Sequence, residues 1–417
     1  MDTPLDMIEQ TTTIEGVEIL YMRKPARYDT KHLVIVFSGF SGNGKPTYNY
    51  HNSFSECPAE VIWIKDSFQG GESYYLCSKG QFNIENAVFK FISIVMKELD
   101  LDTWDCTLLG SSKGGSAAMY YGFKYNFGNI IASVPQFHIG TYVEADWPYA
   151  LKHMTSGLPA NAARDTQGTL DRMITEAISA SLPNKNVYLI TSLADSQYET
   201  EIAPNIDQLK KFTNFNLIMA NSQMIEQHNQ VSRHTIAIAI SIVNLSAMGI
   251  PPKLPQAEIK YRKLSPPKQP SLKPIVALKK FKTQDGNFFP EGISVLRGAP
   301  CPDYSDIKLR LLLKNNEDTV GFLIAKDHKP DLTRELFDGD LVKYDKGWFC
   351  TLGHKGLPID DLPIGKWSAH IEISCRGHVR QAPMISASEF TSSGEGHQKR
   401  MKFTSNATES YFTVTQI

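Results

Sequence analysis

Residues 104–121, WDCTLLGSSKGGSAAMYY, decide the fold of the first part of the chain. An apolar run from Cys106 to Leu109 predicts a short strand, and the Ala/Met/Tyr-rich segment after the glycines predicts a helix. Between them, residues 110–114 (GSSKG) match the G-x-S-x-G pattern of a nucleophile elbow, a tight strand-to-helix turn that presents a serine at the edge of a sheet. Ser112 is therefore the candidate nucleophile.

The small residues around Ser112 have a steric reason. A serine at an elbow adopts an unfavourable backbone conformation, and the strand before it nearly touches the helix after it, so its neighbours must be small. Gly110, Gly114, Gly115 and Ser116 satisfy this requirement. The same residues would also suit an ordinary glycine-rich turn or a phosphate-cradling loop at a helix N-terminus, although the Walker pattern G-x-x-x-x-G-K-[ST] is absent.

The composition is that of a soluble globular protein. The chain has 417 residues, a formal net charge of -1, 41% hydrophobic and 21% charged residues, which is enough for two domains. A charge balance so close to neutral argues against nucleic acid as the main partner. The apolar stretch 235–250 is short for a membrane span and contains serine and asparagine, so it is predicted to be a buried helix.

Cysteine spacing and the N-terminal residues indicate the compartment. The six cysteines lie far apart with no C-x-x-C pair, and the eleven histidines form no H-E-x-x-H motif, so neither a metal site nor a disulfide framework is expected. The first residues, MDTPLDMIEQ, are acidic where an export signal needs a basic start and an apolar core. A reducing cytoplasm is therefore the expected location.

Residues 1–250 alternate strand-like and helix-like segments. Runs such as HLVIVF at 32–37 are continuously apolar, as in strands buried on both faces, and indicate an α/β domain with a mostly parallel sheet flanked by helices. An insert at 139–183 is expected to be less regular, with one helix at 170–180. Further strands are expected at 17–22, 59–64, 129–134, 187–192 and 215–220, and further helices at 83–99 and 230–247.

The amino-acid composition of the sequence changes after residue 250. Prolines and lysines crowd residues 251–275, which are predicted to form a linker. Alternating apolar and polar residues then indicate a smaller all-β, sandwich-like accessory domain over 276–385, and the Ser/Thr-rich residues 386–417 are expected to form a polar, partly disordered tail. Strands of this domain are expected at 293–296, 307–314, 319–325, 348–352 and 366–375.

A serine nucleophile needs a base and, usually, an acid that orients the base. In the α/β-hydrolase arrangement these follow in the order Ser, Asp or Glu, His, each just beyond a strand. Asp195 fits the acid because it comes soon after the strand expected at 187–192, although an aspartate in this position is also typical of a turn or a helix cap. Glu199 and Glu201 are the reserve candidates.

Two histidines follow the last strand of the expected sheet. His228 lies in the loop before the helix, with Asn229 as the expected cap, and is favoured as the base over a simple loop or cap histidine. His234 lies within that helix, six residues further on, so the two side chains do not share one helix face. His138 follows the strand at 129–134 and is placed to line the pocket, but as a base it would break the chain order.

The oxyanion hole is expected to combine two backbone N–H groups. One belongs to Lys113, and the other to Gly39 or Phe40 in the glycine loop that leaves the strand at 32–37, unless that loop is a plain connection. The charge of Lys113 would also lie near an anionic substrate, unless the side chain points to solvent. Candidates for stacking on sugar rings, among aromatic residues that more often belong to the core, are Tyr74, Tyr75, Trp147 and Tyr149.

Four stretches together carry a resemblance to a known family: FSGFSGNG, IKDSFQGGESYYL, LLGSSKGGSAAMYYGFKY, and the later strand and loop with Asp195 and His228. Over roughly residues 15–250 the sequence resembles the α/β-hydrolase-fold proteins of capsular and surface-polysaccharide biosynthesis, which include cytoplasmic capsule O-acetyltransferases and accessory secretion relatives. The resemblance implies that Ser112 accepts an acyl group, that Asp195 and His228 assist it, and that the amides named above bind the oxyanion.

The function expected from these features is serine-dependent acetyl transfer through an acyl-enzyme. As the resemblance implies, acetyl-CoA would be the donor, with no tightly bound cofactor, and a hydroxyl of a bacterial capsular or surface polysaccharide the acceptor. Two alternatives stay open: an esterase or deacylase that uses the same triad on a carbohydrate or small ester, and a non-catalytic scaffold for a glycan or a secretion complex. Expected partners also include a membrane-bound capsule assembly, met at the inner membrane face, and a second copy through the β-rich domain.

Overall fold

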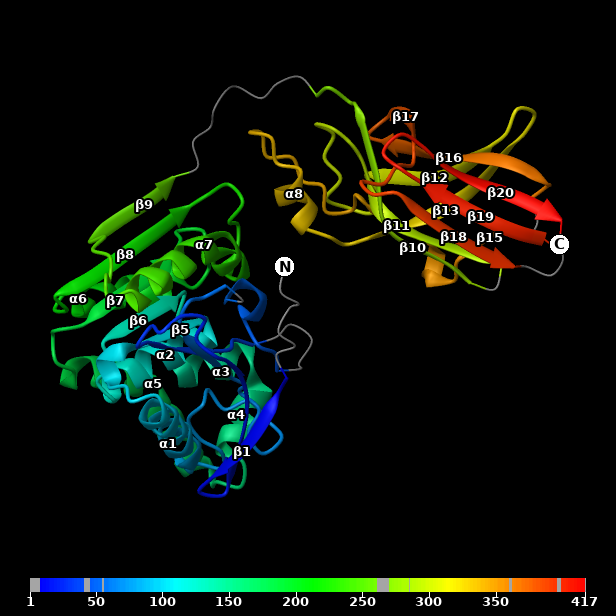
Figure 1. The fold of residues 1–417 in the computed structure, drawn as a ribbon. Coiled ribbons are helices and arrows are strands. Elements are labelled where there is room, and N and C mark those ends of the chain that lie inside the picture. The colour runs from blue at the N-terminus through cyan, green and yellow to red at the C-terminus, as the bar shows by residue number, and fades with distance from the viewer. Residues whose placement is uncertain are drawn as a thin grey trace. The chain divides into compact units, whose positions relative to one another are not determined.

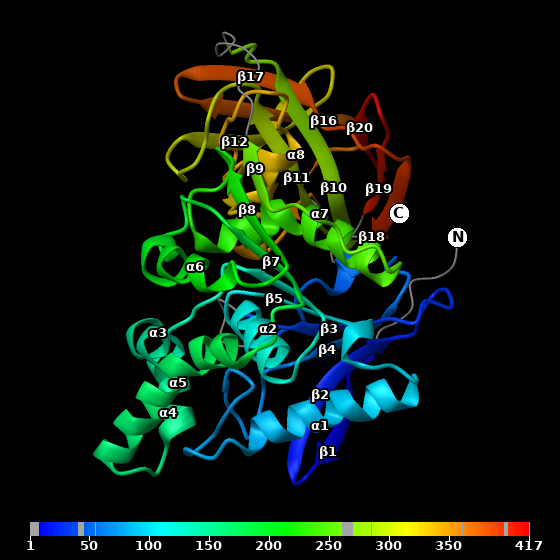
Figure 2. The same cartoon turned by 90° about the vertical axis from the view of Figure 1, so that its left-hand side faces the viewer.

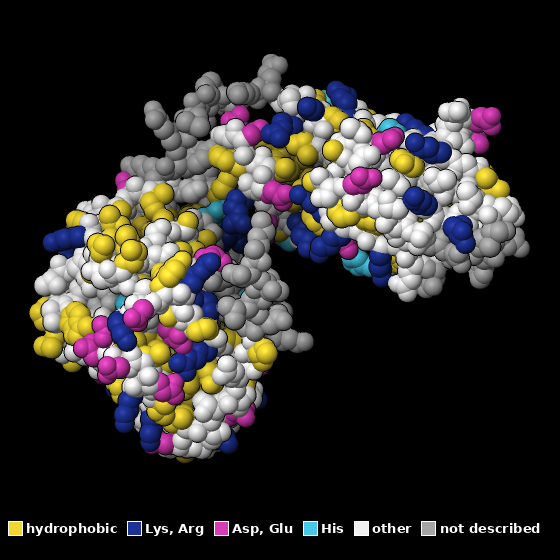
Figure 3. All heavy atoms as spheres, in the orientation of Figure 1, with side chains coloured by type: hydrophobic (Ala, Val, Ile, Leu, Met, Phe, Trp, Pro, Cys, Tyr) yellow, Lys and Arg dark blue, Asp and Glu magenta, His cyan; other side chains and the backbone are white. Residues whose placement is uncertain are grey.

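The computed structural model describes residues 8–40, 46–54, 56–260, 270–284, 286–359, 362–395 and 399–416. The chain divides into two compact units, residues 1–261 and 262–417 (Figures 1 and 2). Side chains of both charge signs are mixed over the visible face of each unit (Figure 3). Among the described helices, none combines the length and the apolar character needed to cross a membrane.

The first unit is built on one nine-stranded sheet in the order β1-β2-β4-β3-β5-β6-β7-β8-β9. Neighbouring strands from β4 to β9 in this order are parallel, whereas β2 is antiparallel to both β1 and β4. The predicted mostly parallel sheet is therefore confirmed. The strands are β1 (Gln10–Ile14), β2 (Val17–Lys24), β3 (Leu33–Phe37), β4 (Glu60–Ile64), β5 (Cys106–Ser111), β6 (Asn129–Ser133), β7 (Asn186–Thr191), β8 (Asn214–Asn221) and β9 (Gln256–Lys260).

Helices pack on both faces of this sheet (Figures 1 and 2). In β3, Leu33, Ile35 and Phe37 belong to the core formed with α1, α2 and α5, whereas Val34 and Val36 belong to the core formed with α7. Both faces of the strand are thus buried, which explains its continuous apolar run. The helices are α1 (Asn83–Glu98), α2 (Lys113–Lys124), α3 (Ile139–Asp146), α4 (Pro148–Thr155), α5 (Ala160–Ala180), α6 (Ile206–Leu209) and α7 (His228–Ala247).

Two regions of the first unit differ from the sequence predictions. The insert 139–183, expected to be less regular with one helix at 170–180, contains the three helices α3, α4 and α5, and the predicted helix forms the second half of α5. Within the expected linker 251–275, residues Gln256–Lys260 form β9, which pairs with β8 at the edge of the sheet. An edge strand needs a partner on one side only, and the prolines at 251, 252 and 255 precede it, so they remove no hydrogen bond from the ladder.

The second unit is almost entirely β, as predicted, with one short α-helix among its described residues, α8 (Asp331–Glu335). Nine of its described strands follow one hydrogen-bonded path, β10-β11-β14-β13-β12-β16-β20-β19-β18, instead of two separately paired sheets, while β15 pairs with β11 and β17 pairs with β16. The end strands of the path contact each other through side chains, since Thr283 Oγ1 lies 2.8 Å from Ser392 Oγ. The strands are β10 (Pro274–Gln284), β11 (Asn287–Leu296), β12 (Ile307–Lys314), β13 (Thr319–Asp327), β14 (Trp348–Cys350), β15 (Leu357–Pro358), β16 (Gly365–Cys375), β17 (His378–Pro383), β18 (Phe390–Glu395), β19 (Lys399–Ser405) and β20 (Ser410–Gln416).

The prediction of a polar, partly disordered tail at 386–417 is wrong. The described residues of this segment form β18, β19 and β20, and β19 and β20 pair along their whole length. Met401 and Phe403 on β19, with Phe412 and Val414 on β20, are buried and alternate with polar residues. Four apolar side chains in period two are enough to anchor this hairpin in the core, although the composition around them is polar.

Candidate active site

The predicted elbow has the backbone of a strained turn. β5 ends at Ser111, α2 begins at Lys113, and Ser112 between them has φ 53° and ψ -123°, which a residue with a side chain rarely adopts. A Cβ on Gly110 would lie 2.1 Å from the backbone of Gly114, and one on Gly114 would lie 2.2 Å from the carbonyl oxygen of Phe37. Only glycine fits at these two positions, as the sequence predicted.

Ser112, His228 and Asp195 form an unbroken hydrogen-bonded chain. Ser112 Oγ lies 2.9 Å from His228 Nε2, and His228 Nδ1 lies 3.0 and 3.1 Å from the two carboxylate oxygens of Asp195. The Asp195 side chain is fully buried, whereas that of His228 is 18% exposed. The three groups thus have the geometry of a catalytic triad, with the histidine between the hydroxyl and the buried carboxylate.

Three elements beyond the carboxyl ends of parallel strands supply these side chains. Ser112 follows β5, Asp195 follows β7, and His228 is the first residue of α7, which follows β8. His228 is therefore the first residue of the helix, preceded by Gln227 at an N-cap position without a side-chain capping hydrogen bond, and does not lie in a loop before a cap at Asn229 as expected. Asp195 also accepts a hydrogen bond from the amide of Gln197 at 2.9 Å, so it closes a turn as well as holding the histidine.

The reserve acids Glu199 and Glu201 and the histidines His138 and His234 are not members of the Ser112–His228–Asp195 chain. Glu201 accepts hydrogen bonds from the amides of Phe137 and His138 at 2.7 and 2.9 Å, and its carboxylate lies 3.3 Å from His138 Nδ1. His234 lies within α7, as predicted. The structure therefore joins His138 to Glu201 rather than to Ser112.

A glutamine that the sequence did not single out touches the nucleophile. Gln136 is fully buried just beyond β6, and its Nε2 donates to Ser112 Oγ at 3.0 Å and to Gln197 Oε1 at 2.7 Å. The hydroxyl of Tyr142 also contacts Ser112, and burial raises the pKa of this phenol, which keeps it protonated. The sequence offered one sign of this role, which is the position of Gln136. It follows the strand next to β5, at the edge of the sheet where such sites lie.

The predicted oxyanion loop packs against the elbow. A Cβ on Gly39 would lie 3.0 Å from the carbonyl oxygen of Ser111, and the Gly39 amide donates to Asn49 Oδ1 at 3.3 Å. The Phe40 ring stacks on Trp147 with centroids 4.1 Å apart and an interplanar angle of 7°. Residues 41–44 of this glycine loop lie outside the described residues.

The Lys113 side chain points neither to solvent nor to a substrate. It is fully buried, with Nζ 2.8 Å from Asp66 Oδ2 and 2.6 Å from Glu72 Oε1. The same Nζ lies 4.3 Å from the centre of the Phe40 ring, a cation–π contact. Because two carboxylates neutralise this charge, the expectation that it meets an anionic substrate is wrong. The side chain instead ties the elbow to the loop that carries Phe40.

The predicted role of Tyr74 and Tyr75 in stacking on sugar rings is wrong. Both are buried, at 1% and 0% exposure, and burial raises the pKa of each phenol well above its usual value. Their amides donate to Asp66, and the Tyr74 hydroxyl donates to Gln136 Oε1 at 3.3 Å. They support the site from within the core. Trp147 is only partly buried and Tyr149 is exposed, so these two remain available to a ligand.

The strand–turn–helix elbow and the serine–histidine–aspartate chain together form a hydrogen-bonded site at the carboxyl ends of the strands of a mostly parallel α/β sheet. No family model matches the sequence, and no curated protein matches it. Among solved structures the chain is similar to the capsule O-acetyltransferase of Neisseria meningitidis serogroup A, at 21% identity and a TM-score of 0.47, over 58% of this chain and 96% of that one.

Two further solved structures are similar to the chain. A mutant of the same Neisseria enzyme in complex with CoA matches at 19% identity and a TM-score of 0.46, over 56% of this chain and 94% of that one. An S-formylglutathione hydrolase from Agrobacterium tumefaciens matches at 15% identity and a TM-score of 0.42, over 58% of this chain and 94% of that one. The structural neighbours thus include both a capsule O-acetyltransferase and hydrolases.

Proposed function

We propose that the chain is a serine-dependent acyltransferase in which Ser112 is the nucleophile, His228 the base and Asp195 the group that orients and stabilises the base. The observation that carries the proposal is the hydrogen-bonded chain from Ser112 Oγ through His228 to the buried carboxylate of Asp195. The strained backbone of Ser112 supports it, because strain of this kind persists where function requires it.

The reaction has two balanced halves. In the first, His228 Nε2 takes the proton of Ser112 Oγ while Oγ attacks the carbonyl carbon of an acyl thioester. The tetrahedral intermediate then expels the thiolate, which leaves as the thiol with the proton from His228. In the second half, His228 removes the proton of an acceptor hydroxyl, the acceptor oxygen attacks the acyl-enzyme, and Ser112 leaves with that proton.

Two amides are assigned to the oxyanion. The Lys113 amide follows the nucleophile at the start of α2, and the Phe40 amide belongs to the loop packed on the elbow. Gly39 is the poorer candidate because its N–H is already directed to Asn49. Gln136 acts on a different atom, because its Nε2 donates to Ser112 Oγ, where negative charge develops when the serine attacks and again when it leaves.

The donor and the acceptor follow the resemblance in the sequence. Acetyl-CoA is the proposed donor, and CoA is also the molecule named with the Neisseria enzyme above. The proposed acceptor is a hydroxyl of a bacterial capsular or surface polysaccharide. Trp147 and the exposed Tyr149, whose rings lie 5.8 Å apart beside Phe40, offer aromatic faces on which a sugar can stack.

Acetyl transfer from acetyl-CoA to a panel of capsular polysaccharides, measured by mass analysis of the glycan, tests the proposal. Wild type should transfer acetyl, and Ser112→Ala should not. Ser111→Ala is the matched control, since Ser111 is the adjacent, buried serine whose hydroxyl contacts Ser232 and not the triad. Transfer that survives in Ser112→Ala would contradict the proposal, and absence of transfer in wild type would favour a role as a non-catalytic scaffold.

Hydrolysis is the second candidate, because the partly exposed His228 side chain leaves solvent within reach of the base. The acetate released and the acetyl incorporated into glycan during turnover of nitrophenyl acetate, each compared with and without a polysaccharide acceptor, separate the two. A transferase should divert acetyl to the glycan when the acceptor is added, whereas a hydrolase should release acetate at the same rate in both conditions.

A further inference from the structure

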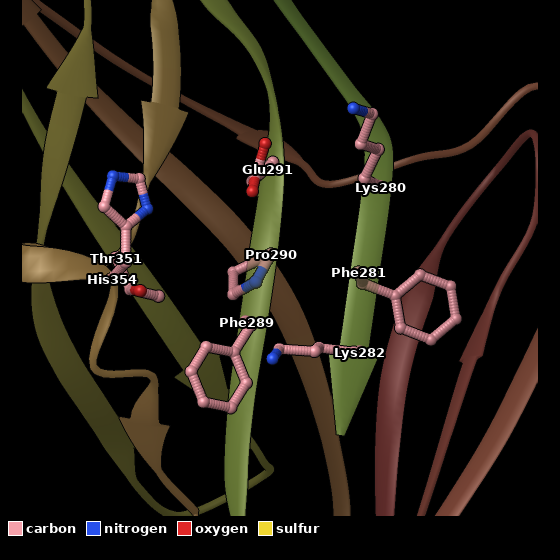
Figure 4. Close-up of a pocket in the computed structure, with 8 residues that line it drawn as sticks. All are labelled: Lys280, Phe281, Lys282, Phe289, Pro290, Glu291, Thr351 and His354. Carbon is pink, nitrogen blue, oxygen red and sulfur yellow. The ribbon is translucent and has the colours of Figure 1, made fainter. Parts of the chain in front are cut away.

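A groove of about 340 Å³ lies on the second unit, where the β10–β11 hairpin meets the short helix η5 (Leu352–His354) (Figure 4). The volume is within the range of about 300–1,000 Å³ found for small-molecule sites. Nothing in the triad chemistry uses this groove. Its lining residues are Lys280, Phe281, Lys282, Phe289, Pro290, Glu291, Thr351 and His354.

The strand register decides which side chains face the groove. Lys280 pairs with Glu291, and Lys282 pairs with Phe289, so these four lie on one face of the hairpin. Phe281 packs on the opposite face, within 5.0 Å of Phe403 in the core, and Figure 4 shows its ring turned away from the others. A bulge between residues 278 and 280 sets this alternation.

Of the ionisable side chains that line the groove, Lys282 has a polar partner within the protein, because its Nζ donates to Gln284 Oε1 at 3.4 Å. Among the described residues, the side chains of Lys280, Glu291 and His354 make no hydrogen bond or ion pair. The neighbouring Lys279, in contrast, lies outside the groove and pairs with Glu335 at 3.0 Å. Two lysines therefore face one carboxylate across the groove, which leaves it with a net positive charge.

An aromatic ring forms the apolar part of the groove. Lys282 Nζ lies 4.5 Å from the centre of the Phe289 ring, and Figure 4 shows the lysine reaching across toward that ring. Gly356 has φ 78°, and a Cβ there would lie 2.7 Å from Phe289 Cζ, so only glycine allows the chain to pass so close to the ring. His354 closes the far side with φ 55°, a conformation that costs energy for a histidine.

We propose that this groove binds one acidic sugar unit of a glycan. The carboxylate or phosphate of the sugar would meet Lys280 and Lys282, its ring would lie on Phe289, and its hydroxyls would donate to Glu291 and His354. A simple inorganic anion uses only the lysines and is repelled by Glu291, whereas a neutral sugar leaves the lysines unpaired. The combination therefore fits a charged saccharide better than either.

The binding claim stands apart from the triad, but its role rests on the proposed function. Suppose that the acceptor is an acidic polysaccharide. When the groove holds one sugar unit, the other units of the same polysaccharide are present at a higher effective concentration at Ser112 of the same protein molecule. Loss of the groove should then raise KM for the polymer without changing kcat. It should leave the hydrolysis of nitrophenyl acetate unchanged, because that ester needs no tether.

Titration calorimetry on the full chain tests binding. The probes are a hyaluronan tetrasaccharide (carboxylate), glucose 1-phosphate (phosphate), chitotetraose (neutral) and inorganic phosphate. Binding of one or both acidic sugars, at least tenfold tighter than chitotetraose and inorganic phosphate, is expected. Equal binding of the neutral sugar or of the bare anion would overturn the proposal, and so would no binding of either acidic sugar.

Matched variants locate the binding. Lys280→Ala/Lys282→Ala and Phe289→Leu should each weaken the acidic sugar at least tenfold, and Lys279→Ala should not. Unchanged affinity in the double lysine variant, with its fold verified by circular dichroism, would contradict the assignment. Ser112→Ala should bind the sugar as wild type does. If the protein binds the acidic sugar but transfers no acetyl, the proposed function is contradicted. If it transfers acetyl but does not bind the acidic sugar, the proposal of sugar binding in the groove is contradicted.

Discussion

Replacing Lys113 with methionine should destabilise the first unit strongly, because it removes the counter-ion of two buried carboxylates. Asp66 is 1% exposed and Glu72 is 3% exposed at the side chain, and Lys113 Nζ lies within 2.8 Å of both. Breaking a buried ion pair by removing one partner costs about 3–5 kcal/mol. Methionine keeps the volume and the apolar stem, so the loss should come from the charge and not from a cavity.

The matched control is Lys90→Met. Lys90 also pairs with a glutamate at 2.6 Å, but both partners are about half exposed, and such surface pairs contribute about 0–1 kcal/mol. Urea unfolding, followed by hydrogen exchange in peptides of the first unit, measures both variants without interference from the second unit. A second change, Glu72→Gln, added to Lys113→Met should restore part of the loss, because one unpaired charge is removed.

A loss of unfolding free energy in Lys113→Met no larger than that in Lys90→Met would contradict this expectation. The side chain would then behave as a solvated lysine, and its contact with the Phe40 ring would not hold the oxyanion loop. Folded Lys113→Met should also transfer acetyl more slowly, because Phe40 loses the cation 4.3 Å from its ring centre.

Three single residues carry the remaining predictions. Ser112→Gly should raise the free energy of unfolding by about 1–3 kcal/mol relative to Ser112→Ala, because only glycine accepts φ 53° without strain; thermal denaturation of the two variants decides it. Gln136→Leu should slow both acylation and deacylation in stopped-flow assays with nitrophenyl acetate; a change in KM alone would contradict a contact with Oγ. Burial lowers the pKa of His32 to about 4, so the unfolded chain binds more protons between about pH 4 and 6.5 and stability falls as pH drops through this window. His32→Gln should remove up to about 3 kcal/mol of that pH dependence in urea titrations, and an unchanged profile would refute it.

The parallel sheet and the elbow were predictable because local sequence determines them. Continuous apolar runs such as 32–37 have no place except between two layers, and the structure contains a separate apolar core on each face of β3. Likewise, Gly110 is required by its contact with the backbone of Gly114, four residues later, and both glycines belong to the G-x-S-x-G pattern. Their spacing around Ser112 therefore indicated the turn without knowledge of the rest of the fold.

The helices α3 and α4 and the first half of α5 escaped prediction because no side chain caps their N-termini, although Pro148 at the first position of α4 was an available start signal. The residues before α3, α4 and α5 are His138, Trp147 and Pro159, and none of these makes a side-chain capping hydrogen bond. These helices are held by packing, since Ala150, Met154 and Leu170 are buried in the main core. Packing of this kind depends on residues distant in sequence, which periodicity alone does not reveal.

The same limit explains the site residues that were misjudged. The burial of Lys113 depends on Asp66 and Glu72, more than forty residues earlier in the chain, and a lysine after an elbow serine gives no sign of them. Tyr74 and Tyr75 enter the core because their amides bind Asp66. Gln136 reaches Ser112 only because β6 lies beside β5, so its role depends on strand order.

Detection of the acyl-enzyme tests the central claim most directly. Wild type is mixed with acetyl-CoA, quenched in acid within milliseconds, digested and analysed by peptide mass spectrometry, with Ser112→Ala and Ser111→Ala treated in the same way. An acetyl group on the peptide that contains Ser112, present in wild type and Ser111→Ala and absent in Ser112→Ala, is the predicted result. An acetyl group that persists in Ser112→Ala, or is never found in wild type while transfer proceeds, would contradict the claim that Ser112 carries the acyl group.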